Sequence, residues 1–189
     1  NFQLELLSPV APMLAQTAAD PGEALEQLGE DTVFEWKMDG ARIQVHKSGD
    51  SVHIYTRSLN DVTAAVPEIA ELVKELPARE VILDGEAIAF TAADRPHPFQ
   101  ITMRRFGRKL DVEKLRAELP MRAYFFDCLR LGEESLADRP TRDRYEALAR
   151  AVPADLIIPR LVTASEEEAS AFYDPAIAAG HEGIMAKSL

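Results

Sequence analysis

The stretch VFEWKMDGARIQVHK, residues 33–47, constrains the fold most, because apolar and polar side chains alternate on both sides of Asp39 and Gly40. A period of two is typical of strands with one buried face, and Asp-Gly is the commonest signal for a tight hairpin. Another strand-like run, residues 51–57, follows the turn sequence KSGDS. The sequence therefore predicts an antiparallel meander with strands at residues 33–37, 42–47 and 51–57.

The rest of the chain carries alternating helix and strand signals. Prolines at first helical positions and a Ser165 to Glu168 capping box mark helix starts. We expect an extended lead-in at SPVAPMLAQ, residues 8–16. We expect helices at DPGEALEQLG, PEIAELVKEL, DVEKLRAEL, TRDRYEALARAV and SEEEASAFYD, and strands at residues 80–90, at residues 121–131 and within HEGIMAKSL. With no internal repeat or flexible linker, this pattern predicts one α+β domain, with antiparallel β-sheets flanked by helices.

Composition excludes several classes of protein. The 189 residues are 47% hydrophobic, which is enough for a core, and the single cysteine rules out an internal disulfide. No apolar run approaches the ~18 residues of a membrane span, and the N-terminus lacks an export signal. We expect a cytoplasmic protein without membrane contact, and the first residue, Asn1, suggests a piece of a longer chain.

Charge gives two opposed indications about nucleic acid. The net charge of −11 disfavours a polyanionic partner. The run RRFGRK, residues 104–109, nevertheless gathers four basic side chains. This run fits either a solvated loop or a phosphate-binding segment.

Lys37 is the first candidate for chemistry. On a strand it shares a face with Glu35 and Asp39, while Trp36 and Met38 point to the other face. Taken alone, this arrangement favours a cross-strand ion pair. The alternative is a nucleophilic amine, which requires a lowered pKa and a strongly electrophilic partner.

Acid-Gly pairs recur beyond Lys37, at Asp84-Gly85-Glu86 and Glu182-Gly183. Glycine at such a place allows the backbone to approach a ligand, and the carboxylate can hold a ribose hydroxyl or a divalent cation. Each pair is weak evidence by itself. Their order along the chain is more specific: KMDG, YTRS, LDGE, YFFDCL and EGIMAK.

These motifs resemble those of the ATP-dependent DNA ligases of replicative and archaeal type. EWKMDG resembles the nucleotidyl-lysine motif, VILDGE the third motif, FFDCLRL the next and EGIMAK the fourth. PVAPMLA and RPHPFQITMRRFGRK extend the resemblance over nearly the whole chain. The resemblance implies that residues 1–189 are an adenylation domain with the ATP-grasp-like core of covalent nucleotidyltransferases.

The resemblance also implies roles for particular residues. Lys37 would attack the α-phosphate of ATP and become lysyl-AMP, and Asp39 would support its loop, with a share in metal or proton handling. The remaining implied roles are Glu35 on adenine, Phe126 and Met185 on the faces of the base, Arg42, Arg57 and Lys187 on ribose and phosphate, Glu86 on ribose or Mg²⁺, and Glu182 on Mg²⁺. Core packing for the apolar side chains, and surface ion pairs for the cations, remain the alternatives.

For the full-length protein, the resemblance implies sealing of nicks in double-stranded DNA, in replication, repair or recombination near the nucleoid. The fifth motif, the downstream OB domain and an upstream DNA-binding domain are expected beyond this chain. We expect a monomer, and a sliding clamp as partner is left open. An RNA ligase, an mRNA-capping-type nucleotidyltransferase and a non-catalytic nucleotide-binding module are the alternative functions.

Overall fold

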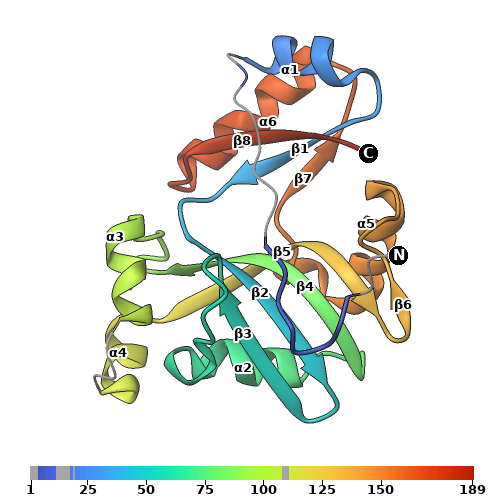
Figure 1. The fold of residues 1–189 in the computed structure, drawn as a ribbon. Helices are drawn as coiled ribbons and strands as arrows, with labels where there is room; N and C mark the ends of the chain where they lie inside the picture. The colour runs from blue at the N-terminus through green and yellow to red at the C-terminus, as the bar shows by residue number, and fades with distance from the viewer. Residues whose placement is uncertain (1–3, 12–17, 19, 108–110) are drawn as a thin grey trace. The chain divides into compact units, whose positions relative to one another are not determined.

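The structure is a computed structural model that describes residues 4–11, 18, 20–107 and 111–189 (Figure 1). These residues form two compact units. The first unit contains residues 4–11 and Gly40–Ile157, and the second contains residues 18, 20–39 and Ile158–Leu189. In the described part of the chain, no helix has the length and hydropathy needed to cross a bilayer.

The first unit is built on a five-stranded antiparallel sheet. Its strands are β2 (Ala41–Ser48), β3 (Ser51–Thr56), β4 (Glu80–Ala89), β5 (Met121–Leu131) and β6 (Glu134–Ser135), in the sheet order β3-β2-β4-β5-β6. β2 and β3 form the predicted hairpin, and Gly49 in its turn has a φ of +60°. β4 lies between β2 and β5, so its residues have a hydrogen-bonded strand on each side.

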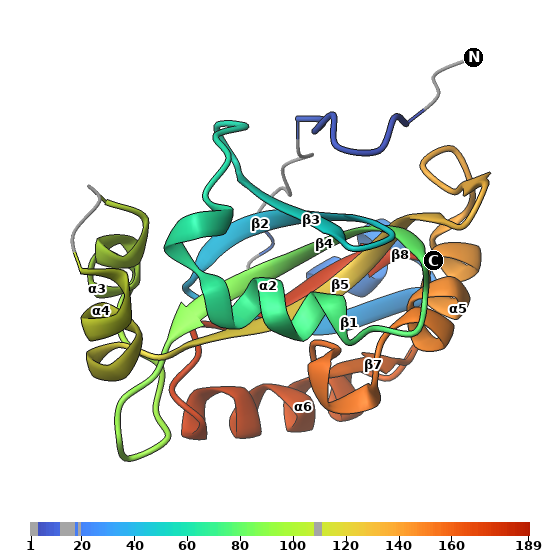
Figure 2. The ribbon, with the colours of Figure 1, turned by 90° about the horizontal axis from the view of Figure 1, so that it is seen from below.

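Two helices, α2 (Pro67–Lys74) and α5 (Thr141–Ala151), pack on one face of this sheet (Figure 2). The strands present alternate apolar residues to them, as a sheet with one covered face requires. Lys47 on β2 reaches the C-terminal end of α2, where its Nζ donates to the carbonyls of Lys74 and Leu76 at 2.9 and 2.6 Å. The buried core on this face includes Ile43, Val45, Ile54, Ile69, Val73, Val81, Leu83, Ala87, Ala123, Phe125 and Leu148.

Short helices complete the first unit. They are η1 (Thr63–Ala65), α3 (Phe99–Thr102), η2 (Met103–Phe106), α4 (Val112–Glu118) and η3 (Ala154–Leu156). The predicted helices at residues 67–76, DVEKLRAEL and TRDRYEALARAV are confirmed. α3 and η2 carry no helical periodicity long enough to be recognised in the sequence.

The basic run RRFGRK is not a uniform surface patch. Arg104 is exposed and Arg105 is buried, whereas residues 108 and 109 lie outside the described part of the chain. The two terminal nitrogens of Arg105 donate to the two carboxylate oxygens of Glu68, at 2.8 and 2.6 Å, and each also meets a backbone carbonyl. For Arg105, a solvated loop and a phosphate-binding role are therefore both wrong, because the guanidinium is a structural link inside the first unit.

The second unit is a three-stranded antiparallel sheet with two helices. Its strands are β1 (Thr32–Lys37), β7 (Arg160–Val162) and β8 (Gly183–Ser188), in the order β7-β1-β8, and its helices are α1 (Pro21–Leu28) and α6 (Glu166–Ala178). The helices pack on the sheet face that carries Phe34, Ile184 and Ala186. Because neighbouring residues of a strand point to opposite faces, Glu35 and Lys37 lie on the face away from the helices.

Capping side chains define where α1 and α6 begin. The carboxylate of Asp20 accepts the N–H of Glu23 at 2.8 Å, and the hydroxyl of Ser165 accepts the N–H of Glu168 at 3.2 Å. The predicted capping box is only half formed, because the Glu168 carboxylate accepts the hydroxyl of Thr163 and the Ser165 N–H donates to that same hydroxyl.

The predicted meander is wrong at its first strand, because β1 pairs with β7 and β8 and not with β2. Asp39 and Gly40 connect β1 to β2 without forming a hairpin between them. A Cβ on Gly40 would lie 2.5 Å from Cγ1 of Ile88 and 2.6 Å from the carbonyl oxygen of Ala87. Glycine is required here for close packing of the chain against β4, a need that looks the same in sequence as a turn.

Residues 4–10, which we call the strap, lie on the sheet face opposite α2 and α5 (Figure 1, dark blue). The N–H of Leu7 donates to Nδ1 of His46 at 2.9 Å, and the hydroxyl of Tyr55 donates to the Leu7 carbonyl at 2.8 Å. The predicted lead-in is irregular, strand-free chain over residues 8–11, and residues 12–16 lie outside the described part.

Replacing Arg105 by methionine should lower the free energy of unfolding by about 3 kcal/mol, because the carbonyls of Ala65 and Leu119 lose a donor and the largely buried Glu68 carboxylate keeps only the N–H of Met121. Arg104→Met removes the same type of side chain from an exposed neighbour and should cost no more than about 0.5 kcal/mol. Urea denaturation of the two variants measures the difference. Equal losses would contradict a structural role for Arg105.

His46 should make the fold less stable in mild acid. Burial, with a smaller contribution from nearby His53, lowers the pKa of His46 to about 4. The unfolded chain therefore binds a proton at His46 near pH 6.5, whereas the folded chain binds it only near pH 4. The free energy of unfolding is highest above pH 6.5 and falls as the pH drops from 6.5 to 4. Between pH 7 and pH 5 we expect a loss of about 2 kcal/mol from this group.

NMR titration of the imidazole gives the direct measurement, with the half-exposed His53 as an internal control. A pKa near 6.5 for His46 would show that the ring is not buried as a neutral acceptor. Urea denaturation of the unmodified chain and of His46→Asn at both pH values should give a smaller pH dependence in the variant.

Candidate active site

Lys37 lies at the end of β1, next to the carboxylate of Glu182, the residue directly before β8. Its Nζ is 3.3 Å from Oε2 of Glu182, and both side chains are about half exposed, at 53% and 45%. The N–H of Glu182 also donates to the carbonyl of Lys37 at 3.0 Å. The structure thus joins the two motifs KMDG and EGIMAK at a solvent-accessible amine, and Asp39 is exposed two residues further on.

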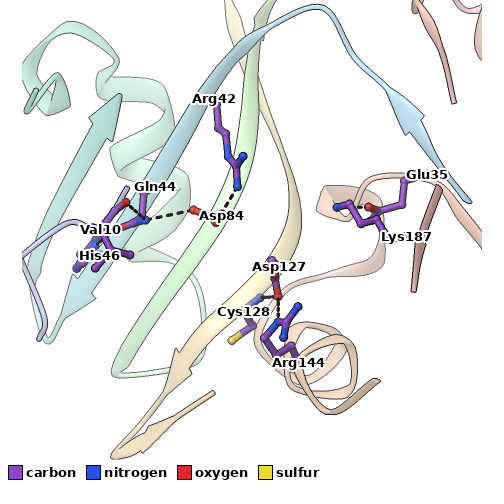
Figure 3. A network of polar contacts seen from close by, with 10 residues as sticks. All are labelled: Val10, Glu35, Arg42, Gln44, His46, Asp84, Asp127, Cys128, Arg144 and Lys187. Carbon is purple, nitrogen blue, oxygen red and sulfur yellow. Dashed lines mark hydrogen bonds and ion pairs between the residues drawn. The ribbon is translucent and has the colours of Figure 1, made fainter. Parts of the chain in front are cut away.

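Glu35 and Lys187 form a second ion pair on the same face of β1 and β8 (Figure 3). The Glu35 carboxylate is buried, with 3% of its side chain exposed. Its Oε1 meets the Lys187 ammonium, whereas its Oε2 is buried and has no hydrogen-bond partner in the described residues. A buried carboxylate oxygen without a donor is costly, so this atom is a candidate acceptor for an N–H group of a ligand.

Met185 completes this face, because it is the Cα partner of Glu35 across β1 and β8. Residues directly opposite each other in an antiparallel pair share a face. The structure therefore brings together five of the predicted site residues within the second unit: Glu35, Lys37, Glu182, Met185 and Lys187.

In the first unit, a second group of predicted residues surrounds Arg42 on β2. Nη2 of Arg42 is 3.2 Å from Oδ2 of the buried Asp84 on β4 (Figure 3). Burial raises the pKa of the Asp84 carboxyl, while the Arg42 guanidinium acts in the opposite direction. Glu86 is the Cα partner of Arg42 across the two strands, so it shares this face.

Phe126 reaches the same face through a β-bulge. Asp84 pairs with Asp127 and Gly85 with Phe125, so Phe126 is the extra residue in β5. Bulges redirect side chains and are common next to functional sites. The Arg42 guanidinium carbon lies 5.2 Å from the centroid of the Phe126 ring, a cation–π distance.

Gly85 has a different role from the one expected. A Cβ at this position would lie 2.8 Å from both Cδ1 of Phe125 and the carbonyl oxygen of Tyr124. The glycine therefore allows β5 to approach β4 beside the bulge. The prediction that it allows close approach of a ligand is wrong, because the space is filled by the neighbouring strand.

Arg57 follows β3 and is exposed. It borders a depression of about 10 Å³ whose lining includes Val10, Arg42, Gln44 and Asp84. The structure thus places Arg57 near Arg42, on the side of the sheet that carries the strap.

Two supporting residues were not recognised as such in the sequence. Asp127 accepts Nε of Arg144 on α5 at 2.8 Å and also accepts the N–H of Cys128 at 2.9 Å (Figure 3). These bonds hold the residue that follows Phe126, and so they fix the bulge. The motif FFDCLRL contains Asp127, but only the bulge reveals what its carboxylate does.

The two predicted Mg²⁺ ligands do not form a ready-made metal cluster. No group of three or more His, Cys, Asp or Glu side chains within the described residues could hold a metal ion. The two predicted ligands, Glu86 and Glu182, lie in different units. Their chemistry suits Mg²⁺, which commonly binds one or two carboxylates together with substrate phosphates, so the metal remains a prediction.

Comparison with known proteins agrees with the motifs. The sequence matches the ATP dependent DNA ligase domain family over residues 12–189. It is 56% identical over 189 residues to a "Probable DNA ligase" of Anaeromyxobacter dehalogenans (strain 2CP-C), and 48% identical over 188 residues to "DNA ligase B" of Mycobacterium tuberculosis (strain ATCC 25618 / H37Rv). Each match covers 100% of this chain but only 37% of the relative.

Solved structures show the same fold. A mycobacterial DNA ligase D complexed with ATP and MES has a TM-score of 0.68 at 27% identity, covering 96% of this chain and 55% of that one. The ATP-dependent DNA ligase of bacteriophage T7, in complex with ATP, has a TM-score of 0.59 at 15% identity, covering 92% and 61%, and shows likeness of fold alone. The expected nucleotidyltransferase fold, with antiparallel sheets flanked by helices, is confirmed. Because the family match extends over nearly all of its residues, this chain belongs to the ATP-dependent DNA ligase domain family.

Proposed function

We propose that this chain is the adenylation domain of an ATP-dependent DNA ligase, with Lys37 as its nucleophile. The observation that carries the proposal is the accessible Lys37 amine, held 3.3 Å from Glu182 where two family motifs meet. In the proposed step, a bond forms between Nζ and the α-phosphorus of ATP while the bond to pyrophosphate breaks. The amine must lose a proton before it attacks, and Glu182 is the carboxylate next to it.

Each unit carries family-motif residues proposed to contact the nucleotide. Glu35 has a buried acceptor oxygen for the adenine amino group, and Met185 and Phe126 offer apolar surfaces to the two faces of the base. The cations would contact ribose and phosphates: Arg42, Arg57 and Lys187. Use of ATP is supported by two similar ligase structures, a mycobacterial DNA ligase D and the ligase of bacteriophage T7, which are complexes with ATP.

Mg²⁺ is the proposed metal, with Glu86 and Glu182 as its protein ligands. When bound, it would neutralise charge on the phosphate oxygens, which is the main requirement of nucleotidyl transfer. Asp39, exposed beside Lys37, would support the loop between β1 and β2.

The full-length protein is proposed to transfer AMP from Lys37 to a 5′-phosphate and to seal nicks in double-stranded DNA. The chain spans just over a third of the curated relatives it matches, at 37% of their length, which supports further domains such as the DNA-binding and OB domains. We propose that the full-length protein acts near the nucleoid, in replication, repair or recombination. We also propose that it is a monomer. RNA ligation is the second candidate, and nicked DNA against nicked RNA as substrate separates the two.

Lys37→Ala should abolish covalent labelling by α-labelled ATP and Mg²⁺, because it removes the amine proposed to form the phosphoramidate. Lys74→Ala, which changes an exposed lysine on α2, is the matched control and should label normally. Label retained on denatured protein is the readout. Labelling of Lys37→Ala at the normal level would refute the assignment.

If the isolated chain does not label, the same pair of variants should be tested in the full-length protein. Absence of label there, with folded protein and ATP present, would favour a non-catalytic nucleotide-binding module.

Glu35→Gln should weaken ATP binding about tenfold, because it removes the charged acceptor offered to the adenine amino group. The rate at saturating ATP should change less, since the carboxylate does not touch the reacting phosphorus. The ATP dependence of labelling measures both quantities, with the exposed Glu133→Gln as control. Unchanged ATP affinity would place the adenine elsewhere.

A further inference from the structure

The strap is held by a side chain that also belongs to the neighbourhood of Arg42. The Gln44 amide binds the Val10 backbone at both ends: Val10 N–H donates to Oε1 at 3.0 Å, and Nε2 donates to the Val10 carbonyl at 3.2 Å. The same Nε2 donates to Oδ1 of Asp84 at 3.3 Å (Figure 3). Gln44 is buried, with 5% exposed, so none of these bonds is readily replaced by water.

The hydrogen bonds around Gln44 and His46 allow only one assignment of donors and acceptors. Val10 fixes which end of the Gln44 amide is oxygen, because its N–H needs an acceptor and its carbonyl needs a donor. Leu7 fixes the His46 tautomer: its N–H donates to Nδ1, so the proton is on Nε2, which donates to Oε1 of Gln44 at 2.8 Å. The strap therefore determines where the free Nε2 hydrogen of Gln44 points, and that is toward Asp84.

The strap itself is held in a strained conformation. Leu7 has a φ of +65°, an uncommon value for a residue with a branched side chain. His46 and Tyr55 bind its N–H and carbonyl, and Nη1 of Arg130 donates to the carbonyl of Leu4 at 3.0 Å. Such strain persists only where the surroundings over-determine it, and it clusters at functional sites.

The Asp84 carboxylate links Gln44 to Arg42. One carboxylate oxygen accepts from Gln44 and the other lies 3.2 Å from Nη2 of Arg42. With Gln44 removed, Oδ1 would be buried without that donor, and the carboxylate would turn or recruit the guanidinium to satisfy it. In either case, Arg42 would lose its present position above the Phe126 ring.

We propose that Gln44 is a positioning residue that couples the docked strap to Arg42, through Asp84, and so sets the place of the guanidinium for the ATP phosphates. This inference rests on the proposed function, because it gives the strap a role in lysyl-AMP formation. It assigns to the segment before the nucleotidyl-lysine motif an effect on the rate of that step.

The test compares two variants that break the coupling from opposite sides. Gln44→Met keeps the length of the side chain and removes its hydrogen bonds, and Val10→Pro removes the strap's N–H without changing the sheet. In the full-length protein, each should lower the rate of lysyl-AMP formation about tenfold at saturating ATP. The exposed Gln27→Met on α1 is the matched control and should react normally.

Double mutants separate positioning from general loss of structure. In an Arg42→Ala background, Gln44→Met should cause no further decrease, because Gln44 acts through the missing guanidinium. Gln44→Met and Val10→Pro should likewise not add. A normal rate in Gln44→Met, or decreases that multiply in the double mutant, would overturn the proposal.

A second readout does not depend on catalysis. NMR relaxation of the Arg42 side-chain nitrogen should show increased mobility in Gln44→Met and Val10→Pro, and not in Gln27→Met. If the unmodified protein fails to form lysyl-AMP but Arg42 becomes mobile in both variants, the proposed function fails and the coupling stands. If Arg42 mobility is unchanged, the coupling itself is wrong.

Discussion

The buried carboxylate of Asp84 is the constraint on which the organisation of the first unit's open sheet face depends. A carboxylate in the middle of a five-stranded sheet needs donors for both oxygens, and at 6% exposure most of them must come from the protein. Arg42 supplies one and Gln44 the other. Gln44 can point its amide correctly only if the strap is docked, so the strap, two strands and the guanidinium form one connected polar network.

The second unit follows the same rule with a different outcome. Glu35 is as deeply buried as Asp84, but only one of its oxygens has a partner, Lys187, within the described residues. The remaining oxygen of Glu35 is the feature on which its proposed contact with adenine rests. Adenine could bind the remaining oxygen without breaking the ion pair, while a phosphate at Lys187 would compete with Glu35. The proposed adenine contact would therefore keep the Glu35–Lys187 ion pair, whereas the proposed phosphate contact would weaken it.

Most of the longer strands and helices could be predicted from sequence, but the β2–β3 hairpin was the one strand pairing predicted correctly. Alternation at residues 33–37 correctly placed Glu35 and Lys37 on one face, because that periodicity is local. The partners of β1 come from residues 160–162 and 183–188, more than a hundred residues away, and Asp39-Gly40 suggested a nearer one. The bulge that exposes Phe126 and the burial of Arg105 were also unreadable, since both depend on how non-adjacent elements pack.

The alternating polar residues of β2 could lie either on a solvated face or on a buried one. The residues Arg42, Gln44 and His46 occupy every second position of β2 and, read alone, indicate a solvated face. Gln44 and His46 are in fact buried, at 5% and 0% exposure, and their partners are backbone groups of the strap. Every residue except proline has the same backbone donor and acceptor, so no side-chain pattern in residues 4–10 could predict these contacts. Gln44 and His46 therefore form an internal interface with the strap, whereas Arg42 keeps 25% of its side chain exposed.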